Sequence, residues 1–167
     1  MEKEKNYSHV VHNFEPVYNA ESRVLILGSF PSVKSREQNF YYGHPQNRFW
    51  KVIAELTKWQ VPVTVEEKKR MLLENRIAIW DVIASCDIIG SSDSSIKNVV
   101  VNDFDAVLRF SKIQRIYANG AKAYSLYQKY VPESPRNNIM KLPSTSPANA
   151  AWSMERLCKA WKDILQE

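Results

Sequence analysis

The feature that most constrains the fold is an apolar strand, followed by a long loop and an amphipathic helix. Residues 24–27, Val-Leu-Ile-Leu, have the length and branching of a buried strand. Apolar residues then recur from Phe49 to Leu56 at the i, i+3, i+4 and i+7 spacing of a helix. The loop between them spans roughly twenty residues, and loops of that length inside a compact domain are usually functional.

Strand and helix patterns alternate along the rest of the chain. Further strands are predicted at residues 77–82, 112–118 and 138–142, and helices at 46–58, at 64–75, after Asn119-Gly120 and over the closing stripe from Met154 to Leu165. Residues 7–22 are expected to be irregular with a possible short edge strand, and Ile83 to Cys86 to form a turn or short helix. The alternation predicts an α/β fold, a three-layer α/β/α sandwich whose central sheet is mostly parallel. Ligand sites in such sheets lie at the carboxyl ends of the strands, where the long loop begins.

Length and composition indicate one domain, residues 1–167, with a mobile tail expected at 1–8. With 44% hydrophobic and 25% charged residues, no apolar run of membrane-spanning length and no leader pattern, a soluble intracellular protein is expected. The net charge of +5 is compatible with a nucleic-acid partner without establishing one.

No metal site is predicted. Cys86 and Cys158 lie far apart in the chain and are expected to be reduced thiols in the core. His9 and His12 have a spacing that ligands can have, but no third ligand lies near them in the sequence.

Four stretches resemble the uracil-DNA glycosylase superfamily, and within it the hypoxanthine-DNA glycosylase branch. Gly28-Ser29-Phe30-Pro31-Ser32 resembles the first motif, and the more specific segment runs from Gly43 to Ile53, Gly-His-Pro-Gln-Asn-Arg-Phe-Trp-Lys-Val-Ile. The other two run from Trp80 to Asn98 and from Leu142 to Asn149. The resemblance covers roughly residues 9 to 165 and implies a four-stranded sheet with the site at its carboxyl edge.

The resemblance also implies roles for individual residues. It makes Asn47 the catalytic residue, whose amide oxygen would orient a water, and Tyr42 the ring that stacks on an extruded base. Gly28, Ser29 and Phe30 complete the base-binding set. The DNA-binding set contains Ser32, Ser144, Ser146 and Lys97, of which the lysine supplies long-range attraction.

Two departures from the wider superfamily bear on the substrate. Phe30 stands where many relatives have Asp or Asn, and Leu142 stands where they have His or Asn. The hypoxanthine-type branch resembles this chain in both departures. Asp81, at the end of a predicted strand, is a candidate second water-orienting group.

These features predict a monofunctional DNA glycosylase, acting as a monomer without metal or cofactor on DNA that contains deaminated bases, most of all deoxyinosine. One alternative is uracil or mixed specificity. The other is a non-catalytic nucleotide- or DNA-binding module on the same scaffold.

Overall fold

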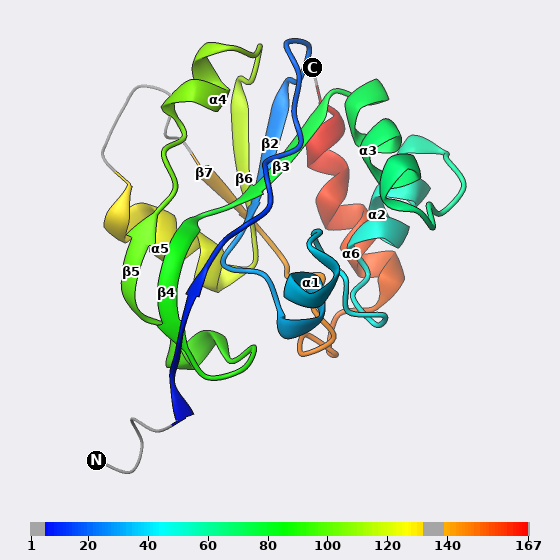
Figure 1. Ribbon diagram of the computed structural model, residues 1–167. Helices are drawn as coiled ribbons and strands as arrows, with labels where there is room; N and C mark the ends of the chain where they lie inside the picture. The colour runs from blue at the N-terminus through cyan, green and yellow to red at the C-terminus, as the bar shows by residue number, and fades with distance from the viewer. Residues whose placement is uncertain (1–5, 132–138, 167) are drawn as a thin grey trace.

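The computed structural model describes residues 6–131 and 139–166, and its centre is a four-stranded parallel sheet (Figure 1). The strands are β2 (Val24–Gly28), β3 (Ile77–Asp81), β6 (Arg115–Asn119) and β7 (Ile139–Leu142), in the order β3-β2-β6-β7. In register, Gly28 pairs with Asp81 and Asn119 with Leu142, so the four carboxyl ends meet at one edge. The predicted parallel sheet is confirmed.

Helices cover both faces of this sheet, as the alternation predicted. On one face lie α2 (Phe49–Thr57), α3 (Val65–Glu74) and α6 (Met154–Trp161), and on the other lie α4 (Asp105–Arg109) and α5 (Ala121–Tyr130) (Figure 1). Strand β2 contributes side chains to the hydrophobic cores on both faces of the sheet, since Ile26 packs toward α2 and Leu27 toward α4 and α5. A fully buried aliphatic side chain of this kind contributes about 1.5–3 kcal/mol.

A second sheet was not predicted. It is antiparallel, with the order β1-β4-β5, and consists of β1 (Ser8–Val11), β4 (Ile83–Ile88) and β5 (Lys97–Val101). The expected turn or short helix at 83–86 is therefore wrong. Short apolar runs do not reveal their partners, and here one partner strand lies near the N-terminus, with Ser8 paired to Ile88.

The other boundaries differ from the predicted ones by a few residues. Helix α3 has the expected capping box, in which the Thr64 hydroxyl accepts from the Glu67 N–H and the Glu67 carboxylate accepts from the Thr64 N–H. The long loop contains a short helix, α1 (Val33–Gln38), that was not predicted, and its N-cap is Ser32. Short 3-10 turns follow at η2 (Asp93–Ser95) and η3 (Lys162–Leu165).

Some expectations fall partly outside the described residues. Of the expected tail at 1–8, residues 1–5 are not described, and Ser8 already belongs to β1. The predicted start of the last strand at residue 138 also lies outside. None of the helices in the described part of the chain has the length and apolarity needed to cross a membrane.

Candidate active site

A cavity of about 310 Å³ opens at the carboxyl edge of the parallel sheet. It is bounded by the long loop after β2, the ends of β3 and β6, the loop before η2 and the loop after β7. Its lining consists of Gly28, Ser29, Phe30, Pro31, Ser32, Ser35, Tyr41, Tyr42, His44, Asn47, Asp81, Ser91, Asp93, Asn119, Ser144, Thr145, Ser146, Pro147 and Ala148. The volume lies within the range of small-molecule sites, and the place is where α/β sheets bind ligands.

The cavity gathers every residue of the sequence-predicted site except one. Asn47, the base-binding set and the three serines of the DNA-binding set all line it. Lys97 does not, because it stands on β5 with its ammonium 4.0 Å from the centre of the Tyr7 ring. Any contribution of Lys97 to DNA binding is therefore separate from the cavity.

Asn47 is held by its amide oxygen. That oxygen accepts the Phe49 backbone N–H at 2.9 Å and the Thr145 hydroxyl at 2.8 Å. A backbone N–H can only donate, so it fixes which end of the amide is oxygen, and both lone pairs of that oxygen are used. The amide nitrogen has no acceptor among the described residues. It is not sealed from solvent, because among those residues the side-chain atom that is both fully buried and unpartnered is the Tyr42 hydroxyl and not this nitrogen.

The orientation of Asn47 changes its expected role. We expected the carbonyl oxygen to hold the water, but the geometry leaves the N–H₂ group for the cavity. Asn119 maintains this arrangement from the end of β6, because its amide donates to the Thr145 hydroxyl and accepts the Thr145 N–H, both at 3.0 Å. Thr145 is fully buried and was missed by the sequence interpretation, which assigned only Ser144 and Ser146 of its loop to DNA binding.

Tyr42 has both a neighbour for its ring and a strained backbone. Its ring stacks on Phe49 with centroids 4.1 Å apart and planes at 21°. Its φ of 52° is in the left-handed region, which a residue of this size rarely adopts outside functional sites. The phenol is buried, which raises its pKa, and the nearby Asp81 charge raises that pKa further. Phe49 thus covers one face of the ring, and Tyr42 itself lines the cavity.

A histidine–carboxylate pair lies close to the Tyr42 hydroxyl. The Nε2 atom of His12 is 2.9 Å from the Asp81 carboxylate, and the two side chains are 2% and 4% exposed. The His12 ring is thus bound to Asp81, and the Nδ1 atom of His9 lies 2.8 Å from the Asp87 carboxylate. Among the described residues, no three side chains of His, Cys, Asp and Glu gather as metal ligands.

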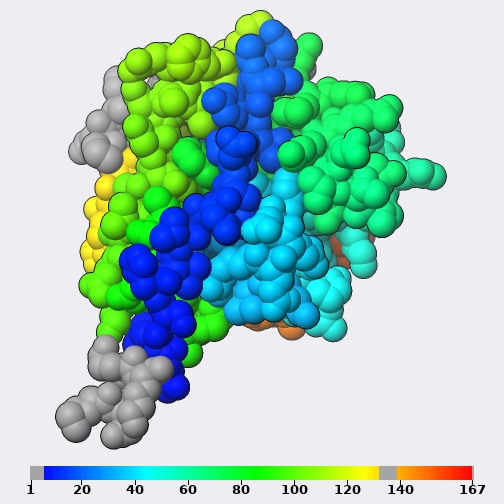
Figure 2. All heavy atoms as spheres, in the orientation of Figure 1, coloured from blue at the N-terminus to red at the C-terminus, as the bar shows by residue number. Residues whose placement is uncertain are grey.

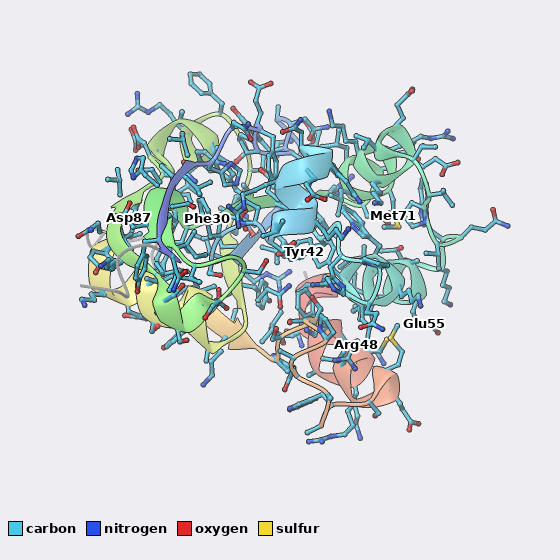
Figure 3. All side chains as sticks on the ribbon, turned by 60° about the horizontal axis from the view of Figure 1, so that its bottom comes forward. Phe30, Tyr42, Arg48, Glu55, Met71 and Asp87 are labelled. Atoms are coloured by element: carbon cyan, nitrogen blue, oxygen red, sulfur yellow. The ribbon has the colours of Figure 1, made fainter. Side chains whose placement is uncertain are left out.

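Arg48 fixes the loop that closes the cavity on one side. Its guanidinium donates to the carbonyl oxygens of Ser146 (3.4 Å), Asn149 (3.1 Å) and Trp152, and its backbone N–H donates to Thr145 O at 3.1 Å. In Figure 3, Arg48 lies beside the orange loop that leads into α6. The arginine therefore couples the start of α2 to the loop after β7.

The opposite rim is polar and tied to the long loop. The Ser29 hydroxyl donates to the Asp93 carboxylate at 3.1 Å, and the Ser91 hydroxyl accepts the Val33 N–H at 2.8 Å. Asp93 is exposed as a residue, but neighbouring atoms partly desolvate its carboxyl and raise the pKa, and the bond from Ser29 opposes that shift. The sequence assigned Ser29 to base binding, and in the structure its hydroxyl already has an internal acceptor in Asp93.

The chain matches known proteins over almost its whole length. The family model described as the uracil DNA glycosylase superfamily matches residues 15–165. A hypoxanthine DNA glycosylase of Methanosarcina acetivorans is 34% identical over 151 residues, covering 88% of this chain and 93% of the relative. One of Methanosarcina barkeri is 30% identical over 112 residues, covering 66% of this chain and 71% of the relative.

A solved structure shows the same fold. It is a solution NMR structure of a Methanosarcina acetivorans protein, named as a candidate uracil DNA glycosylase. The TM-score is 0.72 at 30% identity, and the match covers 92% of this chain and 97% of that protein. The chain therefore belongs to the uracil DNA glycosylase superfamily, and the enzyme class expected from its sequence, a DNA glycosylase that hydrolyses N-glycosyl bonds, is confirmed.

Proposed function

We propose that this DNA glycosylase is monofunctional and hydrolyses the N-glycosidic bond of deoxyinosine, releasing hypoxanthine and leaving an abasic site for base excision repair. The cavity carries the proposal, because it places an aromatic ring, an oriented amide and a loop for the DNA backbone around one small space. Two relatives with 34% and 30% identity are named hypoxanthine DNA glycosylases, which favours this base. We further propose that the enzyme acts inside the cell as a monomer, without a metal or cofactor.

A base inside a duplex is out of reach of such a cavity, so the nucleotide must first leave the stack. The extruded base would enter beside Tyr42 and Phe30, which both line the cavity. Phe30 also carries the Arg36 guanidinium 5.7 Å from its ring centre. Aromatic stacking would offset part of the cost of unstacking.

Water is the nucleophile in this proposal. No lysine lines the cavity among the described residues, so no amine is placed to attack C1′ of the sugar and form a Schiff base. The water oxygen forms the new bond to C1′ as the bond to the base nitrogen breaks, the bonding electrons leave with the base, and the water proton passes to solvent.

Asn47 would position that water. An amide cannot take the proton, and the oxygen of Asn47 is already used, so its N–H₂ group would donate to the water oxygen or to a sugar oxygen. Most of the bond breaking then comes from the departure of the base toward an oxocarbenium-like sugar, with Asn47 holding the attacking oxygen in line.

The DNA backbone would be held by Ser32, Ser144 and Ser146 at the rim of the cavity. The loop after β7 would enter the minor groove, in the shape that Arg48 gives it. Lys97 would add only long-range attraction, because it lies outside the cavity.

The test is a panel of duplexes that each carry one inosine, uracil, xanthine or adenine, incubated with excess enzyme and cleaved at abasic sites by alkali. We expect excision from the inosine duplex, and a fall of about 10²-fold or more with Asn47→Ala, as is common when a water-positioning group is lost. No abasic product from the inosine duplex would refute the substrate. Equal rates for Asn47→Ala and the wild type would remove Asn47 from its role.

Mixed specificity is the second candidate, because one solved relative is named as a candidate uracil DNA glycosylase. Two positions argue against uracil as the main base. Phe30 brings no polar group, and Leu142 is buried in the core and does not line the cavity, so neither can hydrogen-bond a uracil carbonyl. The uracil and xanthine duplexes of the panel measure how far the cavity tolerates them.

A further inference from the structure

The buried pair of His12 and Asp81 has no part in the mechanism above, although the Asp81 side chain lines the cavity. We propose that Asp81 is the residue that distinguishes a deaminated base from its parent, by accepting the ring N–H that deamination creates. The inference rests on the proposed function and adds the atom that reads the base.

One oxygen of Asp81 is held and the other is available. Oδ2 bonds to His12 Nε2 at 2.9 Å, and because an ionised carboxylate can only accept, Nε2 must carry the hydrogen. Oδ1 accepts from none of the described residues. It is still accessible, because the Tyr42 hydroxyl is the one side-chain atom of the described residues that is both fully buried and without a hydrogen-bond partner. The cavity therefore contains an acceptor that the protein leaves unused.

His12 is itself fixed in place. The N-terminal segment that carries it lies across one face of the molecule, between the green segment of β4 and the light-blue long loop (Figure 2). Its backbone N–H donates to Ala84 O at 2.7 Å, and its ring packs against Phe14 and Tyr41, with centroids 4.5 and 5.8 Å away. A carboxylate held by such a support keeps its free oxygen in one direction.

The neighbouring strand leaves room for that oxygen. Gly28 pairs with Asp81 across β2 and β3, and a Cβ at Gly28 would lie 2.5 Å from Oδ1 and 3.2 Å from the Tyr42 hydroxyl. The unused acceptor thus lies close to the Tyr42 hydroxyl, which is itself sealed from solvent. The Asn119 amide is nearby, but its oxygen and nitrogen are engaged with Thr145.

The chemistry of deamination matches the free Asp81 oxygen. In adenine, ring atom N1 has a lone pair and the neighbouring substituent is an amino group. In hypoxanthine, N1 carries a hydrogen and the neighbour is a carbonyl oxygen. The Asp81 oxygen would accept that N–H and repel the lone pair of adenine. Guanine also carries an N1–H, so Asp81 separates hypoxanthine from adenine and not from guanine.

Position separates this role from that of Asn47. Asp81 is 3% exposed at the inner end of the cavity, whereas Asn47 is only partly buried, at the start of α2. A nucleotide that enters base first brings the base edge to Asp81 and leaves the sugar near Asn47. Asp81 is thus assigned to base selection rather than to the attacking water.

The test uses two purine duplexes and Asp81→Asn. The bases are hypoxanthine and unsubstituted purine, which has a lone pair at N1 and no hydrogen, and excision rates are measured in single turnover with excess enzyme. In the variant, His12 donates to the amide oxygen, so the amide nitrogen turns a donor toward the base. We expect the wild type to prefer hypoxanthine, and the ratio of the two rates to fall by about tenfold or more in the variant.

The chain supplies a matched control. His9 and Asp87 form a second His–Asp pair, with a distance of 2.8 Å, between β1 and β4, and neither residue lines the cavity. Asp87→Asn should leave both rates and their ratio unchanged, and thermal melts should show that both variants are folded.

The outcomes distinguish failure of this inference from failure of the proposed function. If Asp81→Asn lowers both rates equally, Asp81 acts on the water or on folding, and the inference is overturned. If the wild type excises purine as fast as hypoxanthine, the N–H is not read, and this result needs no variant. If the wild type excises no hypoxanthine at all, the proposed function fails instead.

Discussion

Replacing Thr145 by valine tests whether the orientation of Asn47 matters for catalysis. The change keeps the shape of the side chain and removes a hydroxyl that donates to Asn47 Oδ1 at 2.8 Å and accepts from Asn119 at 3.0 Å. Because Thr145 is fully buried, one Asn119 N–H would lose its acceptor, which costs about 1–3 kcal/mol. Asn47 would keep the Phe49 N–H, so the free energy of unfolding should fall by about 2 kcal/mol without loss of the fold.

The effect on catalysis should be larger than the effect on stability. With one of its two restraints gone, the Asn47 amide can turn, and a displacement of about 1 Å at a positioning group costs on the order of 10²-fold in rate. Urea denaturation measures the first effect, and single-turnover excision from an inosine duplex at saturating enzyme measures the second. Thr145→Ser keeps the hydroxyl and should retain most of the activity.

A particular result would refute this reasoning. If Thr145→Val excised hypoxanthine within about twofold of the wild-type rate while remaining folded, the amide would need no second restraint. The network from Asn119 through Thr145 to Asn47 would then be structural only.

Three further predictions follow from single features. Arg48→Met should lower the free energy of unfolding by about 2–3 kcal/mol and weaken binding of inosine DNA, because the loop after β7 loses its guanidinium donors. Denaturation measures the first effect and a binding titration the second. Unchanged DNA binding would contradict the role given to the loop. Gly28→Ala should place a methyl group 2.5 Å from Asp81 Oδ1. We expect the free energy of unfolding to fall by about 1–3 kcal/mol and the rate of inosine excision to fall with it. Full activity would show that the carboxylate can move away. Burial raises the pKa of Tyr127 to about 12, and burial together with the hydrogen bond to Asp163 raises the pKa of Tyr117 to about 12. The contribution of these two groups to the free energy of unfolding should therefore be fully present below about pH 10 and fall above it, because tyrosines of the unfolded chain ionise there first. Denaturation across this pH range checks the sign.

The sequence was sufficient for the parallel sheet and for the location of the site. The residues of β2 are apolar on both faces, which is what a central strand between two helical layers requires, and the long loop after Gly28 marks the carboxyl edge. The resemblance to the glycosylase superfamily selected Asn47, Tyr42 and Phe30, and all three line the cavity at this edge.

Contacts between distant parts of the chain could not be found in this way. Strand β4 lies between β1 and β5, and nothing in the run Ile83 to Cys86 indicates the pairing with Ser8 to Val11. Lys97 was expected to supply long-range attraction to DNA, and the pairing of β4 with β5 places it outside the cavity, which the sequence did not indicate.

The sequence by itself therefore determined the layers and the edge that bears the cavity, since periodicity and turn residues act over a few neighbours. It also named nine of the nineteen residues that line the cavity, most of them through the family resemblance. Only the tertiary structure decided which atoms those side chains present. The oxygen of Asn47 faces inward because a threonine 98 positions away donates to it, and Asp81 is held by a histidine 69 positions away. Hydrogen-bond direction depends on the partner that folding brings into contact, and sequence spacing does not contain that information.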